Sequence, residues 1–419
     1  MTFPFPVPVK ALPTMARVRV TFPRPTIPDV PGEVRRGLEG LGLADLRGRR
    51  IAVTAGSRGI RDIVAVLATV TAWIRERGGT PVLVAAMGSH GGGTEEGQRR
   101  LLAHLRITPE SSGGPILTSM DTVELGRTAG GLVAYCDRNA AACEGILVVN
   151  RVKPHTAFAQ PFGSGLLKMI AVGLGKAPAA AQIHRQGPAD MGAAIAAIAA
   201  VVIGTGKILG GLAIIENAYD ETARIVPVRP EEMAAAEGRL FSEATSLMPA
   251  LPIQVLDVLI VDEIGKNYSG TGMDVNVIGR WRMPGLPEPA RPAIQRIVAL
   301  RLSAESEGNA QGVGLADVVT RRLAAAIDPV ATYVNTLVST YVQRAFVPVT
   351  MPTDRDAIEA ALASLNLADP AAARVMRIPN TLHLDECEVS ASILPELPPS
   401  ARAIDDATPM AFSDDGRLL

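Results

Sequence analysis

Short apolar runs alternate with segments of helical period along the first part of the chain. Residues 50–55 and 81–87 are apolar enough to be buried strands, and each run ends at a glycine-containing turn. Between them, residues 60–77 repeat apolar positions at helical spacing and end at Gly78 and Gly79. Two consecutive strand–loop–helix units predict a parallel sheet with right-handed crossovers.

A similar pattern continues toward the C-terminus. Further strands are expected over residues 145–150 and 209–216 and, beyond Pro249 and Pro252, over residues 255–262, 296–302 and 345–350. Further helices are expected over residues 231–247, 315–327 and 355–365. The sequence contains no internal repeat of solenoid length.

These elements predict an α/β protein with two α/β domains. The first would have a mainly parallel sheet in strand–loop–helix units, and the active-site cleft would lie between the domains. Residues 1–250 would form the N-terminal catalytic domain and residues 251–400 a smaller C-terminal α/β domain. Residues 401–419 would form a tail that could pack back on the first domain. A chain of 419 residues is also too long for one ordinary core.

Composition narrows the choice of partners. Hydrophobic residues make up 47% of the chain but aromatic residues only 4%, so Ala, Val, Leu and Ile must fill the cores. This favours helices on a buried parallel sheet. The formal net charge is −1, and Lys and Arg are spread along the chain. Because such a distribution provides no electrostatic footprint for nucleic acid or an anionic membrane, neither is an expected partner.

The three cysteines, Cys136, Cys143 and Cys387, have no metal-type spacing, and their odd number does not suit a disulfide framework. They favour a reducing, cytoplasmic location. The N-terminus lacks a basic segment followed by an apolar core, so no secretory signal is expected. The longest apolar stretch, residues 191–206, is rich in Ala and Gly and too short to span a bilayer, which favours a buried helix.

Two of the five histidines stand just after strand-like runs. Three glycines follow His90 and leave its ring open to approach, while Pro154 fixes the path of the chain before His155. Arg58 follows residues 50–55 in the same way. Because the carboxyl ends of parallel strands share one edge of a sheet, these side chains could converge. An imidazole can move protons or hold a metal ion near neutral pH. The alternative for His90 is a turn histidine bonded to a neighbouring carbonyl.

Lys168 lies in the apolar run Leu166-Leu167-Lys168-Met169-Ile170, where a buried ammonium is costly without a partner or a chemical role. The alternative is a helix lysine that extends to solvent. His184 could be a lone metal ligand. The glycine–lysine pairs at Lys176 and Lys207 do not fit a P-loop, because the first glycine and the hydroxyl residue are missing. The loop over residues 88–93 could still cradle an anion.

Ordered motifs in the first domain resemble the nickel-pincer lactate racemase superfamily of 2-hydroxyacid racemases and epimerases. The strongest match combines Pro154-His155-Thr156-Ala157-Phe158, Gly163-Ser164-Gly165-Leu166-Leu167-Lys168 and, further along, His184. Met87-Gly88-Ser89-His90 and the turn that carries Arg58 are also similar. The resemblance covers most of the first domain and, more faintly, residues 270–276.

The resemblance implies a metal-binding isomerase that carries nickel in a nickel-pincer nucleotide, nickel pyridinium-3,5-bisthiocarboxylic acid mononucleotide. Lys168 would tether this cofactor and His184 would ligate the nickel. His90 and His155 would be the catalytic acid–base pair. Two enantiomers present the substrate hydroxyl differently, so each needs its own base. Passing the α-hydrogen to the cofactor as hydride avoids a carbanion.

By the same resemblance, Arg58 and Ser57 would bind the substrate, since a guanidinium can grip a carboxylate bidentately. In the second domain, Lys266, Asn267 and Arg282 are candidate substrate contacts. The protein would meet cofactor-maturation enzymes transiently, and chain produced in a foreign host would lack the cofactor. An oligomer is compatible with these features.

The turns depart from the family pattern. The first reads Ala55-Gly56-Ser57-Arg58-Gly59 where the family has Asp-His-Thr-Arg-Pro, and the second reads Ser89-His90-Gly91-Gly92 where the family has Thr-His-Arg-Pro. We therefore expect a 2-hydroxyacid other than lactate, and the glycines after His90 leave room for a larger one.

Two alternatives remain open from the sequence. His90, His155 and His184 could ligate one metal ion directly in a hydrolase or lyase. The same scaffold could also be a non-catalytic protein that binds a small anion through Arg58 and the glycine loops.

Overall fold

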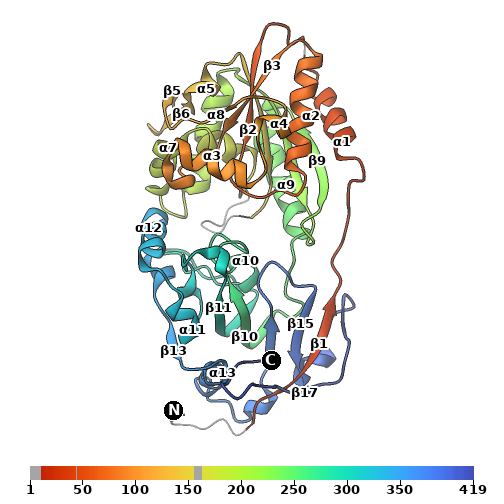
Figure 1. The fold of residues 1–419 in the computed structure, drawn as a ribbon, viewed down its shortest axis with the longest axis vertical. Helices are drawn as coiled ribbons and strands as arrows, with labels where there is room; N and C mark the ends of the chain where they lie inside the picture. The colour runs from red at the N-terminus through yellow and green to blue at the C-terminus, as the bar shows by residue number, and fades with distance from the viewer. Residues whose placement is uncertain (1–10, 44, 155–162) are drawn as a thin grey trace. The chain divides into compact units, whose positions relative to one another are not determined.

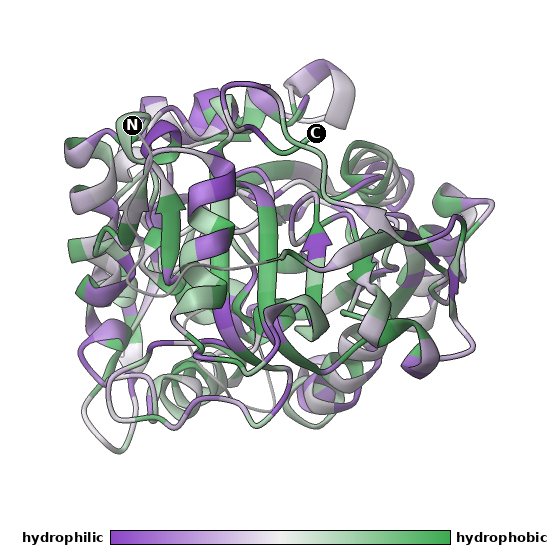
Figure 2. Ribbon diagram, turned by 90° about the horizontal axis from the view of Figure 1, so that it is seen from below, coloured by the Kyte–Doolittle hydropathy of each residue, from purple (hydrophilic) through white to green (hydrophobic). Residues whose placement is uncertain are grey.

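In the computed structural model, which describes residues 11–43, 45–154 and 163–419, the chain forms two units. The N-terminal unit is Pro23–Met248, and the C-terminal unit combines Met1–Phe22 with Pro249–Leu419. Each unit has its own hydrophobic core and its own large sheet (Figure 1). Figure 2 shows that the hydrophobic residues run along the strands of these sheets.

The N-terminal unit contains a six-stranded sheet in the order β4-β3-β2-β7-β8-β9. All neighbours are parallel except β8 and β9. The strands are β2 (Arg50–Ala55), β3 (Thr80–Ala85), β4 (Ile116–Leu117), β7 (Gly145–Arg151), β8 (Ile208–Glu216) and β9 (Thr222–Val228). The chain adds β3 and β4 on one side of β2, and β7 and β8 on the other. The carboxyl ends of β2 and β7 therefore flank the topological switch point, where α/β proteins bind ligands.

Helices cover this sheet, and a two-stranded ribbon of β5 (Thr122–Arg127) and β6 (Val133–Asp137) lies beside them. The apolar sides of α1 and α2 share one core with residues of β2, β3, β7 and β8. The helices are α1 (Val30–Gly40), α2 (Ile63–Glu76), α3 (Glu95–His104), α4 (Pro109–Ser112), α5 (Arg138–Ala141), α6 (Leu166–Lys168), α7 (Lys176–His184), α8 (Met191–Gly204) and α9 (Met233–Ser246).

The predicted α/β class with a mainly parallel sheet is confirmed. In this unit the expected strands agree with the observed ones to within two residues at each end. The side chain of Thr94 caps α3 by accepting the N–H of Gly97 at 3.0 Å. A polar side chain is the usual cap at this position, and the acidic first turn of α3 favours the same helix start. The apolar stretch over residues 191–206 forms the helix α8 up to Gly204, and this helix buries one face and exposes the other.

The C-terminal unit has a mixed sheet in the order β13-β12-β11-β10-β14-β15-β1-β16, with β17 paired to β1. Its first five strands are parallel, and the remaining pairs are antiparallel. The strands are β1 (Thr14–Val20), β10 (Val255–Ile264), β11 (Ala293–Leu302), β12 (Val318–Thr320), β13 (Val349–Met351), β14 (Val375–Ile378), β15 (Glu386–Ser390), β16 (Ala401–Ala403) and β17 (Thr408–Pro409). Its helices are α10 (Val275–Ile278), α11 (Arg321–Ala325), α12 (Pro329–Ser339) and α13 (Asp354–Ala363).

Sequence periodicity was a poorer guide in this unit. The helix expected over residues 315–327 is wrong in its first half, because Val318 and Val319 pair with β11 as a strand and the side chain of Thr320 caps the shorter helix α11. The strand expected over residues 345–350 is reduced to β13, and the 3₁₀ turn η6 (Val342–Ala345) precedes it. The helix α12 between them was not predicted.

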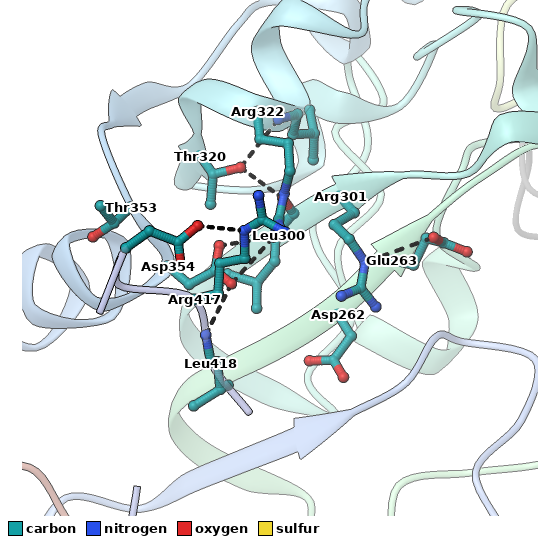
Figure 3. A network of polar contacts seen from close by, with 12 residues as sticks. Asp262, Glu263, Leu300, Arg301, Thr320, Arg322, Thr353, Asp354, Arg417 and Leu418 are labelled. Carbon is teal, nitrogen blue, oxygen red and sulfur yellow. Dashed lines mark hydrogen bonds and ion pairs between the residues drawn. The ribbon is translucent and has the colours of Figure 1, made fainter. Parts of the chain in front are cut away.

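Both terminal segments of the chain belong to the C-terminal unit, which differs from the expected domain limits. Residues 14–20 were expected in the first domain and were not predicted as a strand; they form β1, which pairs with β15 and β16 and belongs to the C-terminal unit. The tail over residues 401–419 lies in this same unit through β16, β17 and Leu418. The N–H of Leu418 donates to Asp354 at 3.1 Å, and Asp354 also pairs with Arg322 at 2.9 Å (Figure 3). The first contact attaches the tail to α13, and the second joins α13 to α11.

Among the described helices, none is by itself both long and apolar enough to cross a membrane. One pair, Leu166–Gly173 with Lys176–His184, satisfies length and composition together but is bent by 107°.

Candidate active site

Two of the predicted site residues are in direct contact. Ser57 lies in the turn after β2, and His90 lies in the turn after β3, the neighbouring parallel strand. The Ser57 Oγ and His90 Nδ1 atoms are 2.5 Å apart. This hydrogen bond joins the two turns and gives the imidazole ring a defined orientation. The His90 side chain remains exposed on the surface of the unit.

The glycines around His90 are required by the backbone. Gly88, Gly91, Gly92 and Gly93 all have φ between 60° and 68°, in the left-handed region that favours glycine. A Cβ on Gly91 would lie 2.6 Å from the backbone carbon of Gly97. The loop can therefore approach the start of α3 closely, which accounts for the glycines without a phosphate ligand.

A buried polar network lies beneath the His90 loop. The amide of Gln98, on α3, donates to the carbonyls of Gly88 at 3.0 Å and His90 at 3.4 Å. Lys176 donates to Gln98 Oε1 at 3.0 Å and pairs with Asp137 at 3.1 Å. The side chains of Lys176 and Asp137 have no exposed surface. This network connects the ribbon strand β6, the start of α7 and the His90 loop.

The opposite charges of Lys176 and Asp137 counteract the pKa shifts that burial causes in both residues. Burial lowers the pKa of Lys176 and raises that of Asp137, and their mutual attraction opposes both changes. Sequence reasoning considered Lys176 only as a P-loop lysine and missed this role. The available signal was a lysine between Leu174 and Ala179, in a segment otherwise too apolar for a solvated charge.

Lys168 ends the short helix α6 and leads into the π-helical turn η2 (Met169–Gly173). Its side chain is half-buried. Burial and, second, the positive charge of Arg58 lower the pKa of Lys168 to about 7. Among the residues that the structure describes, the amine has no ion-pair partner. About half of the Lys168 amine is therefore neutral near pH 7. The π-helical turn that follows is a feature frequent at functional sites.

The start of α6 is fixed by two polar groups. The carboxyl group of Glu237, on α9, accepts the N–H of Leu167 at 3.1 Å, and the Asn150 amide at the end of β7 donates to the carbonyl of Gly165 at 2.8 Å. A Cβ on Gly165 would lie 2.0 Å from Glu237 Oε1, so a larger residue there would displace the Glu237 carboxyl group. The turn η2 also contacts the His90 loop, since the N–H of Gly88 donates to the carbonyl of Gly173 at 3.2 Å.

His184 is the last residue of α7 and is half-buried. Burial and, second, the positive charge of Lys168 lower the pKa of His184, which favours the neutral imidazole. Its Nδ1 atom is buried and has no hydrogen-bond partner in the described part of the chain. A buried polar atom without a partner is costly, so this nitrogen suits a ligand.

Arg58 stands in the turn after β2 with its side chain exposed. Loss of water around the guanidinium, which neighbouring protein atoms cause, and, second, the positive charge of Arg151 lower the pKa of Arg58. Arg151 itself, at the end of β7, pairs with the carboxylate of Glu216, which also accepts the N–H of Arg61 at 2.7 Å. Arg58 has no such carboxylate among the described residues. It is therefore placed to bind an anion from outside the chain.

His155 lies outside the described residues. Its predicted catalytic role stays a prediction. The described residues on either side are joined to each other, because Lys153 and Ser164 exchange two backbone hydrogen bonds of 2.8 Å. The chain thus leaves β7 and returns to the start of α6 at one place, four residues before Lys168.

The described residues, 11–43, 45–154 and 163–419, contain no group of three or more His, Cys, Asp or Glu side chains that could hold a metal ion. All three cysteines are free and buried. Burial raises the pKa of Cys136 and that of Cys387 to about 12, so neither is a thiolate near neutral pH.

The candidate residues of the C-terminal unit bond within that unit. Lys266 donates to the carbonyl of Gly270 at 2.6 Å and to Asn335 at 2.5 Å. Asn267 accepts the Ser303 hydroxyl at 2.7 Å. Arg282 bonds to the carbonyl of Gly314 and lies 3.4 Å from Asp317. Arg282 also lines a cavity of about 400 Å³ together with Met283, Pro284, Glu288, Gln343 and Phe346.

Comparison with known proteins identifies the fold. No family model and no curated protein matches the sequence. Among solved structures, the lactate racemase apoprotein from Thermoanaerobacterium thermosaccharolyticum aligns with a TM-score of 0.55 and 13% identity, over 91% of this chain and 96% of that chain. A protein from Thermotoga maritima aligns with a TM-score of 0.48 and 14% identity, over 66% of this chain and 71% of that chain. The chain has a lactate racemase-like fold.

Proposed function

We propose that this protein is an isomerase that racemises or epimerises a 2-hydroxyacid other than lactate, using a nickel-pincer nucleotide held by Lys168 and His184. The observation that carries the proposal is the neighbouring pair of an amine whose pKa is lowered to about 7 and an imidazole whose buried Nδ1 atom has no partner among the described residues. Arg58, which perturbs the same amine, adds a binding group for a carboxylate. The lactate racemase-like fold supports the same reaction class.

The residues fit the chemical demands of this cofactor. A covalent tether needs an amine that is not locked as an ammonium, and the pKa of Lys168, about 7, meets this need. Nickel binds neutral imidazole, and burial favours that form of His184. When bound, the cofactor would supply a hydride acceptor and donor, so that the substrate α-carbon inverts without becoming a carbanion.

The side chains of this unit would then bind and orient the substrate. The guanidinium of Arg58 can hold the substrate carboxylate through two parallel hydrogen bonds. Ser57 would position His90: if the Nδ1–H of His90 donates to the Ser57 hydroxyl, Nε2 is left unprotonated and can take the substrate hydroxyl proton. The opposite enantiomer presents its hydroxyl elsewhere, and His155 is our candidate for its base.

The test is production of the full-length protein together with the enzymes that build the cofactor, followed by a chirality-resolved screen of hydroxyacids and sugar acids. The wild-type chain should carry the cofactor by intact-mass analysis and interconvert at least one pair of stereoisomers. Lys168→Ala should lose both the added mass and the activity. Lys207→Ala, which removes an amine from the residue directly before β8, is the matched control and should keep both.

Several results would overturn the proposal. Racemisation by Lys168→Ala would exclude the tether. Stoichiometric zinc without an organic adduct would favour direct ligation and hydrolase or lyase chemistry. A cofactor-loaded wild type that binds hydroxyacids, and binds them equally well after His90→Ala, without converting any of them would favour the non-catalytic alternative.

A further inference from the structure

The loop that carries His90 has few side chains with which to hold its own shape. From Gly88 to Gly93, four of the six residues are glycines, so Ser89 and His90 supply the only side chains. Because glycine loses more conformational freedom on folding than any other residue, such a loop needs contacts from outside to keep one conformation. The contact between the His90 ring and Ser57 depends on that conformation.

Gln98, on α3, supplies an outside contact from beneath the loop. Gln98 is fully buried, and its amide nitrogen donates to the carbonyls of Gly88 at 3.0 Å and His90 at 3.4 Å. His90 is therefore held at two points, since Gln98 binds its backbone carbonyl and Ser57 contacts its ring. The first point fixes where the ring starts, and the second fixes where it is directed.

Lys176 determines which way the amide of Gln98 faces. The Lys176 amine donates to Gln98 Oε1 at 3.0 Å, so the oxygen faces the amine and the nitrogen faces the loop. A reversed amide would set its N–H groups against the amine and its oxygen against two carbonyls. Lys176 is itself held in place, because its amine also donates to the carbonyl of Ala85 and pairs with Asp137 at 3.1 Å.

The backbone of Lys176 adopts a conformation that lysine rarely takes. Its φ is 54°, in the left-handed region that is unfavourable for a residue with a Cβ. Strain of this kind persists only where the surroundings hold the residue firmly, and it is concentrated at functional sites. Lys176 is also the first residue of α7, and His184 is the last. One strained position thus connects the helix of His184 to the loop of His90.

A core can be filled without such a polar chain. Apolar side chains of similar volume often replace a buried ion pair with equal or greater stability, whereas hydrogen bonds between buried groups require one arrangement. The chain that runs from Asp137 through Lys176 to Gln98 ends at the two loop carbonyls. Its location therefore suits a role in setting the position of the loop.

We infer that Gln98 is a positioning residue for His90 and that Lys176 sets the orientation of the Gln98 amide. The inference rests on the proposed function for the role of His90 as a base, and it adds the groups that hold this base in place. Gln98 would act through His90 and would touch neither substrate nor cofactor. Without the Gln98 amide, the loop should move, the contact with Ser57 should become intermittent, and the His90 ring should sample both neutral tautomers.

Nitrogen-15 NMR of the histidine rings tests this in the full-length protein without any reaction. The chain has five histidines, and His90→Gln assigns the His90 signals by their loss. At about pH 8, where an ordinary imidazole is neutral, the wild type should show one His90 tautomer. Gln98→Met removes the amide at nearly constant side-chain length, and it should show an average of the two tautomers.

Gln182→Met is the matched control. Gln182 is also buried, and both ends of its amide bond to the backbone of Val133, at 2.9 and 3.0 Å, rather than to the His90 loop. Gln182→Met therefore removes a comparable set of buried hydrogen bonds, and it should lower the melting temperature about as much as Gln98→Met does. The His90 signals of Gln182→Met should match those of the wild type.

Gln98→Glu provides a second variant in case Gln98→Met does not fold. Its carboxylate can still accept from Lys176 but has no N–H for the loop carbonyls, so His90 should again show both tautomers. In cofactor-loaded protein, each folded Gln98 variant should lower kcat by about tenfold, because the base is less often in place. KM should stay close to the wild-type value, since Arg58 still binds the carboxylate.

Several results would overturn the inference. These are two His90 tautomers in the wild type, a single tautomer in a folded Gln98 variant, or the same tautomer change in Gln182→Met. Failure of both Gln98 variants to fold would also overturn it, because Gln98 would then be needed for the fold itself. A loaded wild type that converts no hydroxyacid would overturn the proposed function instead, and the NMR spectra would still decide whether Gln98 positions His90.

Discussion

Ser57 Oγ and His90 Nδ1 lie 2.5 Å apart, although 33 positions separate the two residues in the sequence. The contact exists because the strands before them are neighbours, so their turns lie side by side. Under the proposed reaction, this bond selects the tautomer of His90 and aims its ring.

We predict that Ser57→Ala lowers kcat for interconversion by roughly tenfold or more, because the unsupported imidazole rotates and changes tautomer. KM should change little, since Arg58 remains to bind the carboxylate. Ser57→Thr keeps a hydroxyl and should recover most of the rate. Steady-state kinetics in both directions measure these effects, and a Ser57→Ala enzyme with wild-type kcat would contradict the orienting role.

The amine of Lys168 should react as an unusually acidic ammonium. With a pKa of about 7, its acylation rate should rise with pH and level off above pH 8, whereas an ordinary lysine continues to gain reactivity to about pH 10. Arg58→Gln removes a neighbouring positive charge, which favours the protonated amine, so the midpoint should move to higher pH. Competitive isotope labelling read by mass spectrometry measures both profiles. Identical profiles for Lys168 and Lys207 would show that the environment of residue 168 is ordinary.

The placement of Arg58, Ser57 and His90 could be anticipated because it depends on a general property of parallel sheets. Each residue follows a strand whose apolar run is visible in the sequence, and the carboxyl ends of such strands share an edge. The same reasoning could not find the pair of Lys176 and Asp137. Their contact depends on how the ribbon β5–β6 packs beside α7, which no local period encodes.

The strand pairing in the C-terminal unit could not be predicted from the sequence for a similar reason. No strand was predicted over residues 14–20, and nothing local shows that the neighbours of β1 are β15 and β16, which follow several hundred residues later. Residues 318–320 are the β-branched Val, Val and Thr, but a run of three is too short to mark a strand by itself, and its pairing with β11 makes it one. Tertiary pairing, rather than propensity, decides such short elements.

The buried pair of Lys176 and Asp137 supports a stability prediction. Lys176→Met leaves the Asp137 carboxylate buried without its cation, which should lower the free energy of unfolding by about 3 to 5 kcal/mol. Adding Asp137→Asn should restore part of this loss, because an amide keeps the acceptor for the N–H groups of Asn139 and Ala140 and carries no charge. Urea unfolding of the three proteins measures the cycle. A double variant no more stable than Lys176→Met would show that the charge is not the cause.

The carboxyl of Glu237 should make stability depend on pH in the opposite sense to most acidic groups. Burial raises the pKa of Glu237 to about 7, from an ordinary value of 4.5. Between these two values the folded chain holds a proton that the unfolded chain has released, so its contribution to stability falls as the pH rises and is fully lost above about pH 7. A shift of this size corresponds to at most about 3 kcal/mol.

Glu237→Gln removes the titration while its side-chain oxygen can still accept the N–H of Leu167. The free energy of unfolding of Glu237→Gln should therefore be close to that of the wild type at pH 5 and exceed it at pH 8, with the difference growing through the interval. Chemical unfolding of both proteins at several pH values measures this difference. A difference that is constant with pH would mean that Glu237 is ionised throughout, and the start of α6 would then be held by a charged rather than a neutral acceptor.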